Sequence, residues 1–242
     1  MTDLTKRIPT WPIATDREMA LLREVIESPQ WGGFNGIVQR FEREFAVFQH
    51  ARHGVSAMNG TVTLEMALSV LGIGPGDEVI VPAISFVSSA TAVSRVGATP
   101  VFVDIEESTF NIDPIRAAMA VTPNTKAIMP VHFGGPMAQM DRLTELTGGF
   151  GIALLEDAAH AQGSEWNGKR AGSIGTCSSF SFQNGKVMTA GEGGIVLTNS
   201  DLMAEKFRSF ANQGRRVDGP SNFHHFSLGT NFRVSGPSGR CG

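Results

Sequence analysis

The first fifty residues carry two amphipathic patterns. Thr15 and Glu18 have the spacing of a helical capping box, and we expect the helix that they begin to run to about Ser28. Its apolar positions recur three or four residues apart, at Met19, Leu22, Val25 and Ile26. After the glycine-rich turn WGGFNG, the same spacing predicts a second helix through Val38, Phe41, Phe45 and Phe48.

From residue 54 onward, short apolar runs alternate with helical segments. The runs GVSAM, EVIVP, PVFVDI, KAIMPV and IALLED have the length and composition of buried strands. Helical patterns separate them, namely TLEMALSVLG, SSATAVSRVG, DPIRAAMA and MAQMDRLTEL. Because strands that alternate with helices form parallel sheets, we predict an α/β fold whose mostly parallel, mixed sheet has helices on both faces.

The segment from Gly172 to Asn199 has a different pattern. It contains the strands GTCSSFSF and GGIVLTN, separated by tight turns, and a helix capped by Ser200 follows. We expect one large α/β domain over residues 33–215. A helical segment over residues 1–32 precedes it, and a loop with a polar, glycine-rich tail over residues 216–242 follows.

Composition narrows the class of partner. The chain has 242 residues, of which 41% are hydrophobic, and its net charge of -3 offers no basic face for nucleic acid or an anionic membrane. No stretch has the length of a membrane span or the pattern of a secretory signal, so we expect a cytoplasmic protein that acts on small molecules. Cys177 and Cys241 make neither a disulfide framework nor a metal site, and Cys177 is expected to be buried.

Ligands of open α/β sheets bind beyond the carboxyl ends of the strands, so residues that follow the predicted strands are candidates for chemistry. Gly60 and Thr61 follow GVSAM at a helix start, where free N–H groups and a hydroxyl suit a phosphate. The alternative is a Gly-Thr pair that only turns the chain and caps the helix. Phe86 follows EVIVP, and its ring either stacks on a flat ligand or packs in the core.

Acidic and basic candidates follow two later strands. Asp157 ends IALLED and can hold a pyridinium nitrogen protonated, with His160 bonded to a ring substituent; alternatively, Asp157 caps a turn and His160 is a satisfied polar residue. Lys186 follows SSFSF in a glycine-bearing turn whose nearest following acid is Glu192. Most lysines are solvated, but desolvation here lowers the pKa of Lys186 and makes its amine a nucleophile for an aldehyde. Ser181 offers a further hydroxyl to the phosphate.

Together these groups provide a phosphate cradle, a stacking ring, an acid for a pyridine nitrogen and an amine for an aldehyde. A pyridoxal phosphate site requires this combination. The runs NGTVTLEMAL, PAISFVSSATAV, LLEDAAHAQG, SFQNGKVMTAGEGG and LGTNFR, in this order, resemble the DegT/StrS-type sugar aminotransferases over nearly all of residues 10–233. The resemblance implies the aspartate aminotransferase fold, called fold type I, and pyridoxal 5'-phosphate as cofactor. It also implies transfer of an amino group from glutamate or glutamine to a keto-sugar, usually nucleotide-linked, or to a keto-inositol.

The resemblance also implies roles around the cofactor ring. Lys186 matches the Schiff-base lysine, which distinguishes the chain from similar sugar dehydratases that carry His there. Phe86 matches the aromatic residue that stacks on the ring. Asp157 matches the acid at the pyridine nitrogen, and His160 matches the Gln or His near the ring oxygen.

At the phosphate end, Gly60, Thr61 and Ser181 match the residues that contact the phosphate. Asn231, in LGTNFR, matches the asparagine that reaches the phosphate of the neighbouring subunit. The resemblance therefore implies a homodimer in which each subunit completes the other's site.

The substrate pocket and the end of the chain are less clearly marked. Trp31 and Phe34 are candidates for the pocket by the same resemblance; alternatively they only pack, as a Trp in a glycine-rich loop equally often does. After Arg233 the run VSGPSGRCG departs from the family, whose members continue into a helix and a small C-terminal domain. The resemblance thus predicts a premature end with that small domain missing.

Two alternatives stay open beside the aminotransferase. One is an inactive or regulatory fragment of the same fold, because fold alone does not establish activity. The other is a pyridoxal-phosphate enzyme of another reaction type, such as a lyase. A non-enzymatic nucleotide-binding module fits poorly, because no glycine-rich dinucleotide or triphosphate motif follows any predicted strand.

Overall fold

The computed structural model describes residues 11–29, 31–216, 224–236 and 239. Within these residues the helices are α1 (Asp16–Glu27), α2 (Gly36–Phe48), α3 (Gly60–Val70), α4 (Ser88–Arg95), α5 (Pro114–Met119), α6 (Met140–Phe150) and α7 (Asp201–Ala211). The strands are β1 (His53–Ala57), β2 (Glu78–Pro82), β3 (Thr99–Val103), β4 (Thr125–Ile128), β5 (Ala153–Asp157), β6 (Glu165–Trp166), β7 (Lys169–Arg170), β8 (Cys177–Ser181) and β9 (Gly194–Thr198).

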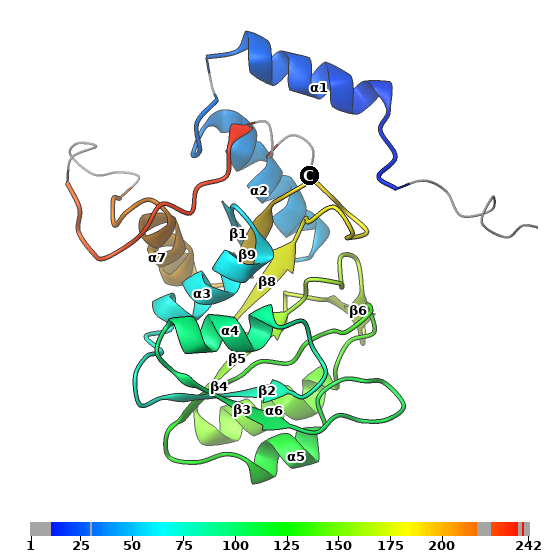
Figure 1. The fold of residues 1–242 in the computed structure, drawn as a ribbon, viewed down its shortest axis with the longest axis vertical. Helices are drawn as coiled ribbons and strands as arrows, with labels where there is room; N and C mark the ends of the chain where they lie inside the picture. The colour runs from blue at the N-terminus through cyan, green and yellow to red at the C-terminus, as the bar shows by residue number, and fades with distance from the viewer. Residues whose placement is uncertain (1–10, 30, 217–223, 237–238, 240–242) are drawn as a thin grey trace, which may run out of the picture.

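Seven of the strands form one sheet in the order β1-β9-β8-β5-β4-β2-β3 (Figure 1). The pairs from β8 to β3 are all parallel, whereas β9 runs antiparallel to both β8 and β1. The predicted α/β class with a mostly parallel, mixed sheet is therefore confirmed. This arrangement places the carboxyl ends of β2, β4, β5 and β8 along one edge of the sheet.

Alternate residues of each strand enter two cores on opposite faces of the sheet. On β5, Leu154 packs with α2, α5 and α6, whereas Leu155 packs with α3, α4 and α7. On β8, Phe180 packs on the α2 face and Cys177 on the α3 face, and both are fully buried. Full burial of a side chain the size of Phe180 contributes roughly 2–3 kcal/mol. Successive strand residues thus serve different layers, as the pleat requires.

The predicted first helix is confirmed. Thr15 is its N-cap and forms the capping box with Glu18, while Ser28 is the C-cap. Of its residues only Val25 is buried, and α1 lies away from the sheet at the top of Figure 1. This helix therefore contributes little to the core of the described residues.

The region after β5 differs from the prediction in two ways. Strands β8 and β9 do pair antiparallel, but residues 182–193 connect them in a loop that is much longer than the tight turn expected. A short hairpin of β6 and β7 was not predicted. Its turn is Asn167–Gly168, both with positive φ, and Asn-Gly is the preferred pair for such a turn. The letters WNGK therefore carried a signal for this hairpin.

The limits of the three predicted segments stay a prediction. Residues 217–223 and most of those after 236 lie outside the described residues, as does Cys241. Residues 224–235 contain no helix or strand, although Asn231 forms an isolated bridge with Asn212. Of the helices described, none is long and apolar enough to cross a membrane.

Candidate active site

A cavity of about 430 Å³ opens at the carboxyl ends of β1, β2, β4, β5 and β8. The sequence predicted eight site residues, and the structure brings seven of them together around this cavity. They are Gly60, Thr61, Phe86, Asp157, His160, Ser181 and Lys186. Four segments that are distant in sequence supply them because parallel strands end at the same edge of the sheet.

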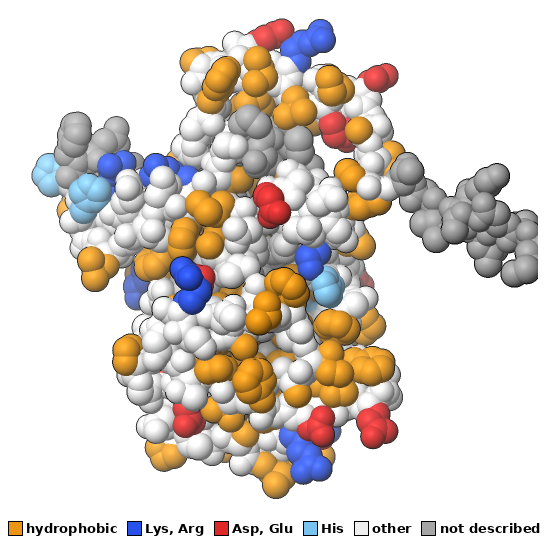
Figure 2. Space-filling view, in the orientation of Figure 1, with side chains coloured by type: hydrophobic (Ala, Val, Ile, Leu, Met, Phe, Trp, Pro, Cys, Tyr) orange, Lys and Arg blue, Asp and Glu red, His pale blue; other side chains and the backbone are white. Residues whose placement is uncertain are grey.

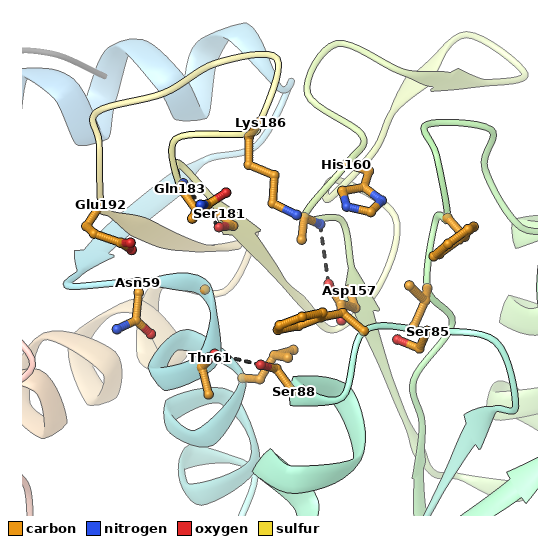
Figure 3. A pocket seen from close by; sticks show the side chains of 16 residues that line it. Asn59, Thr61, Ser85, Ser88, Asp157, His160, Ser181, Gln183, Lys186 and Glu192 are labelled. Atoms are coloured by element: carbon orange, nitrogen blue, oxygen red, sulfur yellow. Dashed lines mark hydrogen bonds between the residues drawn. The ribbon is translucent and has the colours of Figure 1, made fainter. Parts of the chain in front are cut away.

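The start of α3 forms one end of the cavity. Asn59 is the N-cap, and its side-chain oxygen accepts from the N–H of Val62 at 3.0 Å. The alternative interpretation, in which the Gly60-Thr61 pair caps the helix, is therefore wrong, because Asn59 is the cap. The hydroxyl oxygen of Thr61 instead lies 2.7 Å from Ser88 Oγ, as Figure 3 shows. The first N–H groups of the helix have no acceptor within the helix and suit an anion.

Gly60 allows this helix start to lie against β8. A Cβ at this position would lie 2.8 Å from Ser181 Cβ and 3.3 Å from Ser181 Oγ. The Ser181 hydroxyl accepts from the N–H of Gln183 at 3.3 Å, which leaves its own hydrogen available to a ligand. Because Gly60 has no side chain, the first N–H groups of α3 and the Ser181 hydroxyl leave room between them that suits a phosphate.

Asp157 and Glu156 are adjacent on β5 but point to opposite faces of the sheet. Asp157 faces the cavity and α4; its Oδ2 accepts from Ser89 Oγ at 2.7 Å and its Oδ1 accepts from the N–H of Ala159 at 3.3 Å. The side chain is 5% exposed. Asp157 thus stabilises the turn that follows β5, which was the alternative role considered from the sequence. It also lines the cavity.

Glu156 lies outside the cavity. Its two oxygens accept from the N–H groups of Gly172, Ile174 and Gly175 at 2.6–3.0 Å and contact His132 Nε2 at 3.1 Å. It therefore has a structural role beneath the cavity, whereas Asp157 faces the cavity itself.

Lys186 extends from the loop after β8 into the cavity, toward His160 and Asp157 (Figure 3). The loop holds its backbone through a bond from Lys186 N–H to the carbonyl of Gln183 at 2.9 Å. The side chain is half-buried, and this burial lowers the pKa of Lys186, whereas the negative charge of Asp157 opposes the shift. A lower pKa provides more of the neutral amine, which is the nucleophilic form.

His160 is fixed from the opposite wall. Its Nδ1 accepts from the N–H of Gly134 at 3.1 Å, and its ring meets the Phe133 ring edge-on with centroids 5.7 Å apart. Burial lowers the pKa of His160, and the charge of Lys186 lowers it further, although Asp157 acts in the opposite direction. Because Nδ1 is an acceptor, the neutral ring carries its proton on Nε2 and can donate from that atom.

Phe86 is 67% exposed at the cavity, so it does not pack in the core, and its ring is free to lie against a flat ligand. Three other aromatic or polar candidates do not line this cavity. Trp31 is 55% exposed, Phe34 lines a second cavity of about 400 Å³, and Asn231 is exposed beside α7.

Sequence reasoning missed several residues that line the cavity. They are Asn59, Ser85, Ser88, Val131, Phe133, Gln183 and Glu192. Five of them, namely Asn59, Ser85, Val131, Phe133 and Gln183, lie two to five residues beyond strand ends, where ligands of open α/β sheets bind. Among the described residues there is no cluster of His, Cys, Asp or Glu able to hold a metal ion.

A model of the DegT/DnrJ/EryC1/StrS aminotransferase family matches residues 12–240. The chain belongs to this family. Its sequence is 48% identical over 231 residues to the 3-amino-5-hydroxybenzoate synthase of Amycolatopsis mediterranei, covering 94% of this chain and 59% of that protein. It is 38% identical to the GDP-perosamine synthase of Caulobacter vibrioides, covering 97% of this chain and 63% of the relative.

Solved structures of family members have the same fold. The crystal structure of 3-amino-5-hydroxybenzoic acid synthase superposes with a TM-score of 0.93 at 45% identity, covering 96% of this chain and 61% of the other. The pyridoxal phosphate form of the putative sugar aminotransferase Spr1654 from Streptococcus pneumoniae gives a TM-score of 0.89 at 29% identity, covering 97% of this chain and 64% of the other. The chain thus spans about 60% of the length of these relatives.

Proposed function

We propose that this chain is the cofactor-binding part of a pyridoxal-phosphate-dependent aminotransferase, and that the amine of Lys186 binds the cofactor's aldehyde. The observation that carries the proposal is the meeting of Lys186, Asp157 and the cradle at Gly60 in one cavity. A structural neighbour in pyridoxal phosphate and pyridoxamine phosphate forms supports this choice of cofactor.

The residues present fit this cofactor along its whole length. The bare Cα of Gly60 and the hydroxyls of Thr61 and Ser181 would hold the phosphate at the helix start. Asp157 would balance the positive charge of the ring nitrogen, and Phe86 would cover one ring face and exclude water from it.

When bound, pyridoxal phosphate supplies an aldehyde that takes up an amino group and a ring that withdraws electrons from the carbon that loses a proton. Lys186 would move that proton. Its Nζ would accept that proton as a general base and return it as a general acid. The lowered pKa of Lys186 favours the first of these steps at neutral pH. His160 would donate from Nε2 to the ring oxygen.

The donor and acceptor are proposed from the relatives. Several are glutamine-dependent inosose aminotransferases by name, with identities of 38–39%. We therefore propose glutamine or glutamate as amino donor and a keto-sugar, usually nucleotide-linked, or keto-inositol as acceptor. The 3-amino-5-hydroxybenzoate synthase at 48% identity is named for an aromatic product, so an acceptor panel must also contain carbocyclic ketones.

The site is proposed to be completed by a second copy of the chain. Figure 2 shows hydrophobic side chains on the face in view; Phe86, which lines the cavity, and the adjacent Val87 are 67% and 62% exposed. Exposed apolar surface of this kind favours association. In the proposed homodimer Asn231, which lies outside its own cavity, reaches the phosphate of the neighbouring subunit.

Cofactor binding tests the proposal. The purified chain with pyridoxal phosphate should develop a visible absorption band, and reduction with borohydride should attach the cofactor to the peptide that contains Lys186. Lys186→Ala should abolish the attachment, whereas Lys169→Ala, which changes an exposed lysine on β7, should leave it intact. A chain that stays colourless, or attachment that persists in Lys186→Ala, would rule out the role of Lys186.

Activity measurements then distinguish the alternatives. Transfer of an amino group from glutamine or glutamate to a ketone of the panel would support the aminotransferase. Elimination or decarboxylation without amino transfer would instead support another pyridoxal phosphate reaction. Cofactor binding without any turnover would point to the inactive or regulatory fragment.

A further inference from the structure

Ser89 has a buried hydroxyl that contacts Asp157 but does not line the cavity. The residue lies in the first turn of α4 and is 1% exposed. Its Oγ donates to Asp157 Oδ2 at 2.7 Å and lies 2.6 Å from Ser85 Oγ. Because a hydroxyl has one hydrogen, and Ser89 gives it to Asp157, Ser85 must be the donor in the second contact. The directions of both bonds are therefore determined.

The two oxygens of Asp157 are held by donors from different elements. Ser89 bonds Oδ2 from α4, and the N–H of Ala159 bonds Oδ1 at 3.3 Å from the turn after β5. A carboxylate held at both oxygens cannot rotate freely, and its remaining lone pairs have a fixed direction. No side chain caps α4, so the hydroxyl of Ser89 is not engaged in starting its own helix.

We infer that Ser89 is a positioning residue that orients the carboxylate of Asp157 toward the ring nitrogen of pyridoxal phosphate, with Ser85 holding Ser89 in turn. This role rests on the proposed function, because it requires the cofactor in the cavity. It adds to that function the hydroxyl of Ser89, which does not line the cavity and would act on the ring only through Asp157. The length of the bond to Asp157 is in the range of strong hydrogen bonds to a carboxylate.

The experiment compares two ligands that differ only at the ring nitrogen. Dissociation constants are measured by equilibrium dialysis for pyridoxal phosphate and for its deaza analogue, in which a C–H replaces the ring nitrogen. The wild-type chain should prefer pyridoxal phosphate. Ser89→Ala should bind pyridoxal phosphate roughly 10-fold more weakly and the analogue as well as wild type does, because one hydrogen bond to a charged group is lost.

Matched variants separate orientation from folding. Ser94→Ala removes an exposed hydroxyl that bonds only within α4, and it should alter neither constant. Ser85→Ala should reduce the preference for pyridoxal phosphate in the same direction as Ser89→Ala but by less, because its effect passes through Ser89. Thermal unfolding of each variant without ligand verifies that the fold is retained.

Three outcomes would overturn the inference in distinguishable ways. An equal loss of both ligands in Ser89→Ala would assign the residue a structural role only. A wild-type chain that binds both ligands equally would show that Asp157 does not engage the ring nitrogen, which leaves the cofactor proposal standing. A wild-type chain that binds neither ligand would contradict the proposed function itself and the role of Ser89 with it.

Discussion

Glu156 Oε2 and His132 Nε2 lie 3.1 Å apart, and both side chains are fully buried. The other ring nitrogen of His132 accepts from the N–H of Ala138 at 3.2 Å, so it carries no proton and the imidazole is neutral. Nε2 therefore donates to Glu156. This bond connects the loop after β4, which supplies Val131 and Phe133 to the cavity, to the strand that carries Asp157.

Glu156→Gln should destabilise the chain by about 3 kcal/mol. The buried carboxylate accepts from four donors with two oxygens, whereas the amide has one acceptor oxygen and one NH₂ donor. The new NH₂ would face N–H groups that now bond the carboxylate, such as that of Gly175 at 2.6 Å. Urea unfolding measures the change. Glu107→Gln, at an exposed position, is the control and should change stability by less than about 0.5 kcal/mol. Equal effects of the two substitutions would contradict the importance of the buried cluster.

Gly60→Ala should weaken phosphate binding. A Cβ would lie 2.8 Å from Ser181 Cβ, so the helix start must move away from β8 and its N–H groups would leave the cradle. We expect pyridoxal phosphate affinity to fall roughly 10-fold, comparable to the loss of one charge-assisted hydrogen bond. Titration calorimetry with pyridoxal phosphate measures it.

Gly148→Ala is the matched control for that substitution. Gly148 lies in α6 with open space around a built Cβ, so alanine should stabilise the helix by up to about 1 kcal/mol without affecting the cofactor. If both variants bound pyridoxal phosphate as wild type does, the cradle at the start of α3 would not be the phosphate site.

The reactivity of Lys186 should depend on pH in a direction that the charges determine. Burial lowers the pKa of Lys186, so its neutral amine should be present at lower pH than that of an exposed lysine. The charge of Asp157 raises the pKa of Lys186, and Asp157→Asn should therefore lower it further. The pH profile of reductive methylation of Lys186, followed by mass spectrometry, should move to lower pH in this variant.

Asp141→Asn, an exposed substitution at the start of α6, should leave that profile unchanged. Movement of the profile to higher pH in Asp157→Asn would show that the two side chains do not interact as the geometry indicates. Methylation of Lys186 at the same pH as exposed lysines would contradict the effect of burial.

Local features of this protein could be predicted from the sequence. The caps at Thr15 and Ser200 depend on residues no more than three positions away in sequence. Both predicted caps are present. The apolar runs predicted β1 to β5, β8 and β9 as elements. The Asn-Gly pair between β6 and β7 is also a local feature, and it indicates the hairpin that was not predicted.

The candidate site was predicted only where a residue follows a strand or begins a helix. Asp157, Lys186 and Gly60 were predicted in this way, and all three line the cavity. Asn59 was missed as the cap of α3 because either Asn59 or Thr61 is chemically suited to that position, and only the backbone conformation distinguishes them. The exposure of Phe86 was equally undecided, because a single aromatic residue has no periodicity of its own.

The sequence by itself determined the helices, the strands and the residue types at their ends, because hydrogen bonds within a turn and the alternation of a strand depend on near neighbours. The tertiary structure alone decided which of these ends meet. Strand order places β8 beside β5, and Gly60 contacts Ser181 across 121 positions of sequence because helix packing on the sheet brings them together. The bond from Ser89 to Asp157 arises in the same way, from the packing of α4 on the face toward which Asp157 points.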